Sequence, residues 1–203
     1  MSEQTGHWDS VYRDRAETDV SWYEPRPETS LRLIADAGVS HTAPVIDIGG
    51  GASRLAEALF AEGYSDLTVL DLSPHALARA ATRLPEGAPV EWIAGNVLAW
   101  APARQYALWH DRAAFHFLTD PFDQGRYAQT LAAALAPGGH AVIATFAPEG
   151  PDRCSGLPVA RWDGPALAAH FGPGFELAVS ERHAHTTPGG VVQRFHYGVL
   201  RRL

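Results

Sequence analysis

The sequence has little cysteine, no long apolar run and no surplus of positive charge. Cys154 is the only cysteine in the 203 residues, so an internal disulfide is impossible and a reducing compartment suits the chain. The longest apolar stretches, Ala99 to Ala103 and Val142 to Ala147, are much shorter than the roughly 20 residues that cross a bilayer. We therefore expect no membrane span.

The charge balance and the N-terminal segment exclude further classes of protein. The formal net charge is -7 at pH 7, which argues against a broad basic face for nucleic-acid phosphates. Met1 to Trp8 has neither the basic start nor the apolar run of a secretory signal, which favours a cytoplasmic location. With 46% hydrophobic and 19% charged residues, residues 1–203 are expected to form one globular domain.

Short β-type runs alternate with Ala- and Leu-rich helical runs from Val45 onward, which is typical of a parallel sheet with helices on both faces. Strands are predicted at Val45–Ile48, Leu67–Leu70, Val90–Ala94, Tyr106–His110 and His140–Phe146. Helices are predicted at Glu28–Ala37, Ser53–Glu62, Pro74–Leu84 and Arg126–Leu135, the last ending in a turn over Leu135–Gly139. Two later β-type runs, Phe175–His185 and Val191–Arg201, flank a Pro-Gly-Gly turn and predict an antiparallel hairpin.

The segment before the first strand, residues 1–40, is predicted to be an N-terminal arm followed by a helix. Gly6–Arg26 is rich in aromatic residues, with Trp8, Tyr12, Trp22 and Tyr23. One interpretation is an arm that packs permanently on the domain. The other is a lid that covers a bound cofactor and excludes water.

A glycine turn and an aspartate predict a ligand site. Asp47 lies in the first strand and Gly49 to Gly51 follow it, where a helix begins; in an open α/β sheet this crevice binds ligands. Glycine lets the backbone approach a ligand closely, and a helix start offers free N–H donors. Asp71 ends the second strand, 20 residues after Gly51, at the spacing from which a carboxylate accepts hydrogen bonds from a ribose. The two features predict a nucleoside-bearing ligand.

The third glycine of the dinucleotide fingerprint is missing. Arg54 stands three residues after Gly51, where NAD- and FAD-binding domains pack a helix closely on the sheet through glycine. This disfavours an NAD-dependent oxidoreductase, which stays open as an alternative. A cofactor-binding module without catalysis is a second alternative.

The whole combination resembles the class I S-adenosylmethionine-dependent methyltransferase family over nearly the entire chain. Asp47, Gly49, Gly50 and Gly51 match the family's first motif. The resemblance implies a doubly wound, mostly parallel seven-stranded sheet with a C-terminal antiparallel hairpin. It also implies S-adenosylmethionine as cofactor and S-adenosylhomocysteine as product.

The resemblance implies a role for several other residues. The glycine turn is expected to lie against the methionine part of the cofactor, and Asp71 with the adjoining Leu72 against the ribose. Asn96 and Val97 match the segment that contacts the adenine, although the family usually has aspartate where this chain has Asn96. His110, at the end of the fourth strand, and the arm residues Trp22 and Tyr23 complete the expected cofactor site.

Catalysis by such an enzyme needs alignment more than acid–base chemistry. A sulfonium methyl is already activated, and proximity and orientation supply about 7–11 kcal/mol of such a barrier. A base is needed only when the nucleophile arrives protonated. Asp111, His110 and His116, on or just after the fourth strand, are the candidate catalytic residues.

The substrate is expected to be a small molecule, methylated on a nucleophilic heteroatom. The runner-up is a protein-lysine methyltransferase, because Trp109–Leu118 resembles a segment of small enzymes of that kind and of thiol methyltransferases. Arg153 or Arg161 is a candidate for holding an anionic substrate group. The oligomeric state is left open.

Metal binding is the remaining alternative. His183 and His185 lie on one face of a predicted strand, with His196 on the partner strand and Cys154 earlier in the chain. Histidine and cysteine are suitable zinc ligands, but the spacing matches no known zinc pattern. We therefore predict no metal.

Overall fold

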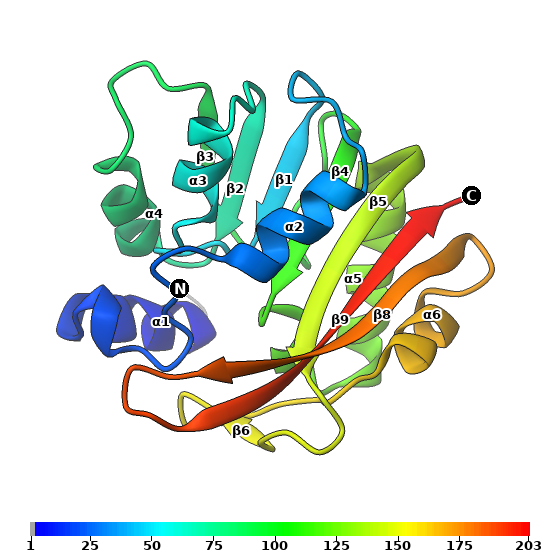
Figure 1. The fold of residues 1–203 in the computed structure, drawn as a ribbon. Helices are drawn as coiled ribbons and strands as arrows, with labels where there is room; N and C mark the ends of the chain where they lie inside the picture. Colours follow the sequence, from blue (N-terminus) through cyan, green and yellow to red (C-terminus); the bar gives the residue numbers. More distant parts are fainter. Residues whose placement is uncertain (1–2) are drawn as a thin grey trace.

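The computed structural model describes residues 3–203, so Met1 and Ser2 of the predicted arm lie outside the described residues. Seven strands form one sheet in the order β3-β2-β1-β4-β5-β9-β8, and two short strands form a separate hairpin (Figure 1). The sheet strands are β1 (Val45–Ile48), β2 (Leu67–Asp71), β3 (Val90–Ala94), β4 (Tyr106–Arg112), β5 (Leu135–Phe146), β8 (Phe175–Thr186) and β9 (Val192–Arg202). The separate hairpin pairs β6 (Arg153–Cys154) with β7 (Leu157–Pro158).

Six α-helices and two short 3-10 helices connect the strands of the described chain. They are α1 (Glu3–Asp14), η1 (Glu17–Asp19), α2 (Glu28–Asp36), α3 (Leu55–Ala61), α4 (Pro74–Ala81), η2 (Phe115–Phe117), α5 (Pro121–Ala134) and α6 (Gly164–Phe171). Figure 1 shows α2 in front of the sheet and α5 behind it. Among the described residues, no helix is both long and apolar enough to span a membrane.

The strand order places a switch point beside β1. β1 pairs in parallel with β2 on one side and with β4 on the other, while the chain order of the strands reverses there. β9 pairs antiparallel with both β5 and β8. The predicted doubly wound sheet with a C-terminal antiparallel hairpin is therefore confirmed, and ligands of such sheets bind at the carboxyl ends of the strands near the switch point.

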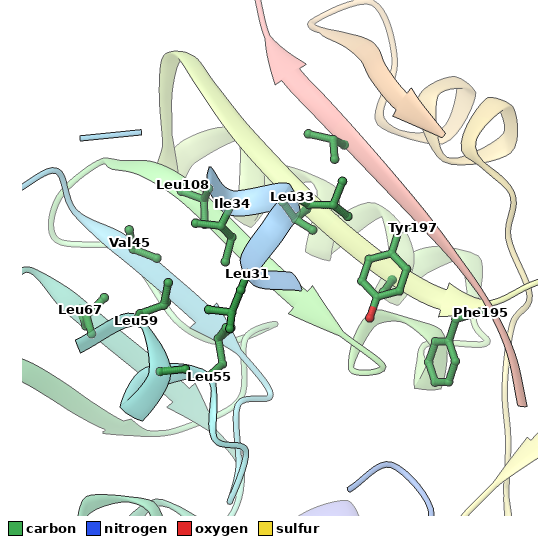
Figure 2. Packing of buried hydrophobic residues seen from close by; sticks show 14 of the residues in the cluster. Leu31, Leu33, Ile34, Val45, Leu55, Leu59, Leu67, Leu108, Phe195 and Tyr197 are labelled. Carbon is green, nitrogen blue, oxygen red and sulfur yellow. The ribbon is translucent and has the colours of Figure 1, made fainter. Parts of the chain in front are cut away.

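Two apolar clusters hold helices against opposite faces of the sheet. The first includes Leu31 and Ile34 of α2, Leu55 of α3 and alternate strand residues such as Val142 (Figure 2). The second includes residues of α5 and α6 with the intervening strand residues, among them Trp109. Strand side chains alternate between the two faces, so both faces of the central strands β1 and β2 are buried, and these strands are largely apolar.

The structure differs from the sequence prediction in one additional helix and in the starts of α5 and β5. The arm begins with a helix, α1, which its polar sequence did not predict. Helix α5 starts at Pro121 and not at Arg126, because the Asp120 side chain accepts a hydrogen bond from the Phe122 N–H and caps it. Leu135 already pairs with β4, so the predicted turn before the fifth strand lies within β5, where Gly138 has a φ of 79°.

Candidate cofactor site

A cavity of about 240 Å³ lies at the carboxyl ends of β1, β2 and β3. Each of the three strands contributes the segment that the sequence singles out. Gly49 follows β1, Asp71 and Leu72 end β2, and Asn96 and Val97 follow β3, and all five line the cavity. The structure therefore brings together residues that are as far as 48 positions apart in the chain.

A smaller cavity of about 50 Å³ adjoins the first across the glycine turn. Gly49 and Trp22 line both cavities, while Asp47, Gly50 and His110 line only the smaller one. The predicted arm residue Tyr23 lines the smaller cavity as well. Its lining is more polar, because it also includes the side chains of Glu17, Glu24, Ser30, Ser53 and Arg54.

The glycine turn needs glycine for space as well as for conformation. Gly49 has a φ of 65° and Gly51 a φ of 51°, in the left-handed region that favours glycine. A Cβ added at Gly50 would lie 2.5 Å from Asp47 Oδ2 and 2.6 Å from the Val69 side chain. A side chain on this turn would therefore displace the residues that support the cavities.

Asp71 is a buried carboxylate at the cavity wall, without an ion-pair partner in the part of the chain that the structure describes. Its Oδ1 accepts a hydrogen bond of 2.8 Å from the Ser73 backbone N–H. Burial raises the pKa of Asp71 to about 7; the Ser73 N–H opposes the shift and the charge of Asp47 adds to it. A carboxylate placed in this way can accept hydrogen bonds from ligand hydroxyls.

We expect cofactor affinity to depend on pH through Asp71. Hydroxyl groups donate to the ionised carboxylate, so affinity should be constant well above pH 7 and fall as pH drops through the pKa of about 7. Between pH 8 and pH 6 the loss should be roughly tenfold, measured by calorimetry with S-adenosylhomocysteine. Asp71→Asn is the control, because it removes the titrating carboxylate while the ligand's own ionisable groups still titrate. If affinity fell equally with pH in that variant, the assignment of the pH dependence to Asp71 would be contradicted.

Asn96 faces the same cavity from the end of β3. Its amide oxygen already accepts a hydrogen bond of 2.9 Å from the Leu98 backbone N–H, which fixes the orientation of the side chain. A carbonyl oxygen has a second lone pair, and the amide nitrogen has two donors. Asn96 can therefore both accept from and donate to a ligand.

The arm covers the cavity with aromatic side chains. Trp8 and Tyr12 of α1 and Trp22 after η1 all line it. The rings of Trp8 and Trp22 meet edge to face at 5.8 Å, and Trp8 meets Phe117 of η2 at 4.9 Å. The buried tyrosine hydroxyl of Tyr12 has its pKa raised, first by burial and then by the charge of Asp71.

Two sets of hydrogen bonds attach α1 to α4. The Ser73 hydroxyl donates to the Asp9 carboxylate at 2.5 Å, and Arg79 donates to the backbone oxygens of Tyr12 and Arg15. Ser73 also caps α4 and donates its N–H to Asp71. The arm is thus joined to the segment that directly follows Asp71.

Arg112, at the end of β4, ties the next part of the arm to the sheet. Its guanidinium donates to the Trp22 backbone oxygen at 3.0 Å and to the Tyr197 hydroxyl at 3.2 Å. One nitrogen lies 3.1 Å from the Glu24 carboxylate, and the guanidinium stacks over Phe195 at 4.8 Å. Burial alone would raise the pKa of Glu24, but a hydrogen bond from His185 and the charge of Arg112 hold that pKa below its usual value.

Breaking this ion pair on one side should destabilise the fold. Arg112→Met leaves the largely buried Glu24 carboxylate without its main cation, which should lower the free energy of unfolding by about 2 kcal/mol or more. Arg112→Met with Glu24→Gln should cost less than the sum of the two single changes, measured by urea unfolding as a double-mutant cycle. The exposed Arg32–Asp36 pair is the control, where Arg32→Met should cost less than about 1 kcal/mol. Equal losses at both sites would contradict the role of Arg112.

A buried chain of hydrogen bonds supports the smaller cavity. His110 Nδ1 lies 2.7 Å from Asp47 Oδ1, because the two residues are partners across β1 and β4. His110 Nε2 lies 2.9 Å from the Ser30 hydroxyl of α2. These hydrogen bonds fix the His110 imidazole between β1, β4 and α2. Asp47, His110 and Ser30 all line the smaller cavity.

Comparisons with known proteins agree with this geometry. A family model described as a methyltransferase domain matches residues 45–139, which contain the glycine turn, Asp71 and Asn96. Trans-aconitate 2-methyltransferase of Rhizobium meliloti is 27% identical over 172 residues, which are 84% of this chain and 63% of that protein. These matches support assignment to the class I S-adenosylmethionine-dependent methyltransferase family.

Solved structures share the methyltransferase fold across the full chain. An S-adenosylmethionine-dependent methyltransferase from Anabaena variabilis has a TM-score of 0.78 at 14% identity, covering 100% of this chain and 96% of the other. The N-methyltransferase NodS from Bradyrhizobium japonicum, in complex with S-adenosylhomocysteine, has a TM-score of 0.73 at 18% identity, covering 97% and 98%. The chain spans 63% and 66% of the lengths of the curated relatives it matches.

The residues present fit the cofactor of this methyltransferase family, which confirms the prediction of S-adenosylmethionine. Gly50 leaves space that a Cβ would fill, and Asp71 offers a buried carboxylate to the cavity. The adjoining smaller cavity is lined by hydrogen-bond donors and acceptors, including acidic side chains such as Glu17 and basic side chains such as Arg54. Such a wall suits a ligand that combines an uncharged nucleoside with an amino acid.

Two of the three candidate catalytic residues of the methyltransferase lie away from both cavities. The Asp111 carboxylate is fully buried and accepts hydrogen bonds from the Ala114 and Phe115 N–H groups and from the Tyr127 hydroxyl at 2.6 Å. Burial raises its pKa to about 6, against these hydrogen bonds. These contacts give Asp111 a structural function at the start of η2; a catalytic role stays an untested prediction.

His116 is also buried, and burial lowers its pKa to about 3, with the charge of Arg112 adding to the shift. Its ring packs against Phe117 and Phe146, and it lines neither cavity. A histidine with so low a pKa is a poor base at neutral pH. Of the three candidates, only His110 reaches a cavity, and it is held there by Asp47 and Ser30.

The candidate substrate arginines and metal ligands do not converge. Arg153 donates to the Gly156 backbone oxygen and Arg161 to the Gly150 backbone oxygen, and neither lines a cavity. Among the described residues, no three His, Cys, Asp or Glu side chains are arranged to hold a metal ion. His185 and His196 make hydrogen bonds to Ser21 and Ser180 respectively.

Sequence reasoning assigned no role to several residues of the site. They are Glu24, Ser30, Arg112, Leu157 and Pro158, together with Phe117 of η2. The carboxyl-end position of Arg112 on β4 was a usable signal, because it follows His110 by two residues. The others come from the arm, α2, η2 and the β6–β7 hairpin, and no local pattern predicts how these elements are placed.

Proposed function

We propose that this protein transfers a methyl group from S-adenosylmethionine to a small molecule, by in-line displacement onto a nucleophilic heteroatom. The observation that carries the proposal is the meeting of Gly49, Asp71 and Asn96 in one cavity under the aromatic arm. When bound, the cofactor supplies a sulfonium-activated methyl group. Residues 1–203 act as one methyltransferase domain, in which residues 1–40 supply the N-terminal arm, as a lid over the cofactor, and the helix α2 that follows it.

The proposed cofactor contacts follow the two cavities. Asp71 and Leu72 bind the ribose, and Asn96 and Val97 bind the adenine in the larger cavity. Asp47, Gly49 and Gly50 support the methionine part at the smaller cavity, and Gly51, which lines neither cavity, completes the turn beside Tyr12 and Asp71. His110, Trp22 and Tyr23 close that side.

The chain contributes position and exclusion of water. Trp8, Tyr12 and Trp22 cover the larger cavity, so an acceptor beside the cofactor is shielded from solvent. Holding the two reactants in line supplies about 7–11 kcal/mol of the barrier. The tyrosine and cysteine side chains that line the cavity are poor bases near neutral pH, because burial raises their pKa values.

A small acceptor is supported by the partly covered cavity and by one relative. The covering arm leaves a compartment bounded by Trp8, Phe117 and Leu157, which suits a small molecule better than a folded protein. The name of the Rhizobium meliloti relative gives trans-aconitate, a small organic acid, as what that protein methylates. A protein lysine is the alternative acceptor.

Isotope-labelled S-adenosylmethionine separates these two acceptors. A cell extract is incubated with the protein and labelled cofactor, then split into small-molecule and protein fractions for mass spectrometry. We expect enzyme-dependent label among the small molecules. Label confined to lysines of protein bands would replace the small-molecule proposal, and no enzyme-dependent label in either fraction would count against methyl transfer.

A further inference from the structure

One side of the larger cavity is left over once the cofactor residues are set apart. We call this side the acceptor wall; it consists of Trp8, Phe117, Cys154, Leu157 and Pro158, and it shares Trp22 with the proposed cofactor site. It comes from three separate elements, namely the arm, η2 and the β6–β7 hairpin. A side chain of the hairpin turn, Ser155, lies 3.5 Å from His7 of the arm, so the two elements meet beside the cavity.

The acceptor wall is aromatic and apolar. The Trp8 ring meets Trp22 at 5.8 Å and Phe117 at 4.9 Å, in both cases edge to face. Leu157 and Pro158 face them from the hairpin. Because these three rings also line the cavity, they offer stacking and edge contacts to a flat aromatic ligand.

The acceptor wall carries no charge that is free to pair with an ionised acceptor. Among the described residues that line this cavity, Asp71 and Arg112 are the charged ones. Asp71 belongs to the ribose site. Arg112 is paired with the Glu24 carboxylate at 3.1 Å and donates to the Trp22 backbone oxygen and the Tyr197 hydroxyl, while its Nη2 makes no hydrogen bond to the described residues. An ionised carboxylate or ammonium buried against this wall would therefore lose its hydration without gaining an ion-pair partner.

The wall also holds no group that would remove a proton from the acceptor. Burial raises the pKa of the Cys154 thiol to about 11, and the nearby charge of Arg112 only partly opposes this. Tyr12 and Tyr127 likewise have pKa values above their usual range. The reacting lone pair must therefore be free before the acceptor enters the cavity.

We propose that the acceptor is an uncharged, planar aromatic compound whose reacting atom is an unprotonated ring nitrogen. This inference rests on the proposed methyl transfer. The nitrogen lone pair forms the new bond to the methyl carbon while the carbon–sulfur bond breaks and its electron pair returns to sulfur. The positive charge moves from sulfur to the methylated ring, and no proton has to leave.

Binding of a matched two-ring series tests the charge requirement. Isoquinoline, 2-naphthoate and 2-naphthylmethylamine, which is an ammonium at pH 7.5, are titrated into protein saturated with S-adenosylhomocysteine. Isoquinoline should bind at least about tenfold more tightly than either charged compound. Labelled S-adenosylmethionine should then convert it to N-methylisoquinolinium. Equal or tighter binding of a charged compound, or no binding of isoquinoline to the saturated protein, would overturn the inference.

A single charge placed on the acceptor wall should reverse the preference. Leu157→Asp puts a carboxylate opposite the aromatic rings, so 2-naphthylmethylamine should bind about tenfold more tightly than to the unmodified protein. Leu157→Asn is the matched control of similar size, and it should not gain ammonium binding. Failure of Leu157→Asp to gain it, while S-adenosylhomocysteine still binds, would overturn the placement of the acceptor.

The cofactor titration keeps the two proposals apart. If S-adenosylhomocysteine does not bind the unmodified protein, the proposed function itself fails. If it binds all three proteins alike and the ring compounds do not follow the predicted order, only the acceptor inference fails. Binding of S-adenosylhomocysteine also reports that each variant is folded.

Discussion

Gly49→Ala is expected to abolish measurable cofactor binding. Gly49 has a φ of 65°, where alanine costs about 1–2 kcal/mol. Its Cβ would also lie well inside contact distance of the Ala114 Cβ, and relieving such overpacking typically costs a further 1–3 kcal/mol or so. The turn lines both cavities, so its displacement should lower S-adenosylhomocysteine affinity by roughly 100-fold or more, measured by calorimetry.

Gly38→Ala is the matched control for this prediction. Gly38 has nearly the same φ, 68°, but a Cβ there would meet no atom within 4 Å. It follows α2 and lines neither cavity. Its alanine variant should lose only the conformational cost of about 1–2 kcal/mol and keep its cofactor affinity. If both variants bound S-adenosylhomocysteine equally well, the turn would not be part of the cofactor site.

Asp71→Ala should have the second large effect, on affinity and not on folding. Two ribose hydroxyls donating to one carboxylate contribute roughly 3 kcal/mol, since hydrogen bonds to charged groups give about 1.5–3 kcal/mol each. The dissociation constant for S-adenosylhomocysteine should therefore rise roughly 100-fold. The variant should remain folded, because removing an ionised buried carboxylate also removes its desolvation cost.

Asp66→Ala separates the ribose role from a general loss of charge. Asp66 directly precedes β2, at the end opposite Asp71, and pairs with Arg104 on the surface. Its replacement should leave the dissociation constant unchanged. A similar weakening in both variants would mean that net charge, and not contact with the ribose, controls affinity.

The sheet and its ligand-binding edge could be predicted from the sequence because local chemistry determines them. The predicted bounds of β1 and β3 match the structure, and Ser73 followed by Pro74 starts α4 as expected. The glycine turn, Asp71 and Asn96 all depend on strand ends that are visible in the hydrophobic pattern. Residues at the carboxyl ends of parallel strands meet without further information.

The roles of the polar residues after β4 could not be predicted in the same way. Asp111 and His116 lie within a few positions of His110, yet only His110 reaches a cavity. Asp111 is turned toward η2 and the Tyr127 hydroxyl, 16 residues later. Such orientations depend on partners from distant elements, which the strand pattern does not contain.

The arm and the acceptor wall depend on tertiary packing even more. The sequence of α1 is polar on average. The helix is held in place because the Ser73 hydroxyl donates a hydrogen bond to Asp9 and Arg79 donates one to the Tyr12 backbone oxygen. Arg112 and Glu24 are 88 positions apart in the chain. The aromatic content of Gly6–Arg26 indicated that this segment packs, but not that Trp8 would face Phe117 and the β6–β7 hairpin.

Calorimetric titration of the unmodified protein with S-adenosylhomocysteine tests the central claim most directly. The site described here predicts one cofactor per chain with micromolar affinity, which is about -8 kcal/mol. NAD⁺ titrated under the same conditions should give no binding, because Arg54 replaces the third glycine of the dinucleotide fingerprint. Binding of NAD⁺ in place of S-adenosylhomocysteine would contradict the cofactor assignment. Binding of neither ligand would also contradict it, provided that the protein unfolds cooperatively and is therefore folded.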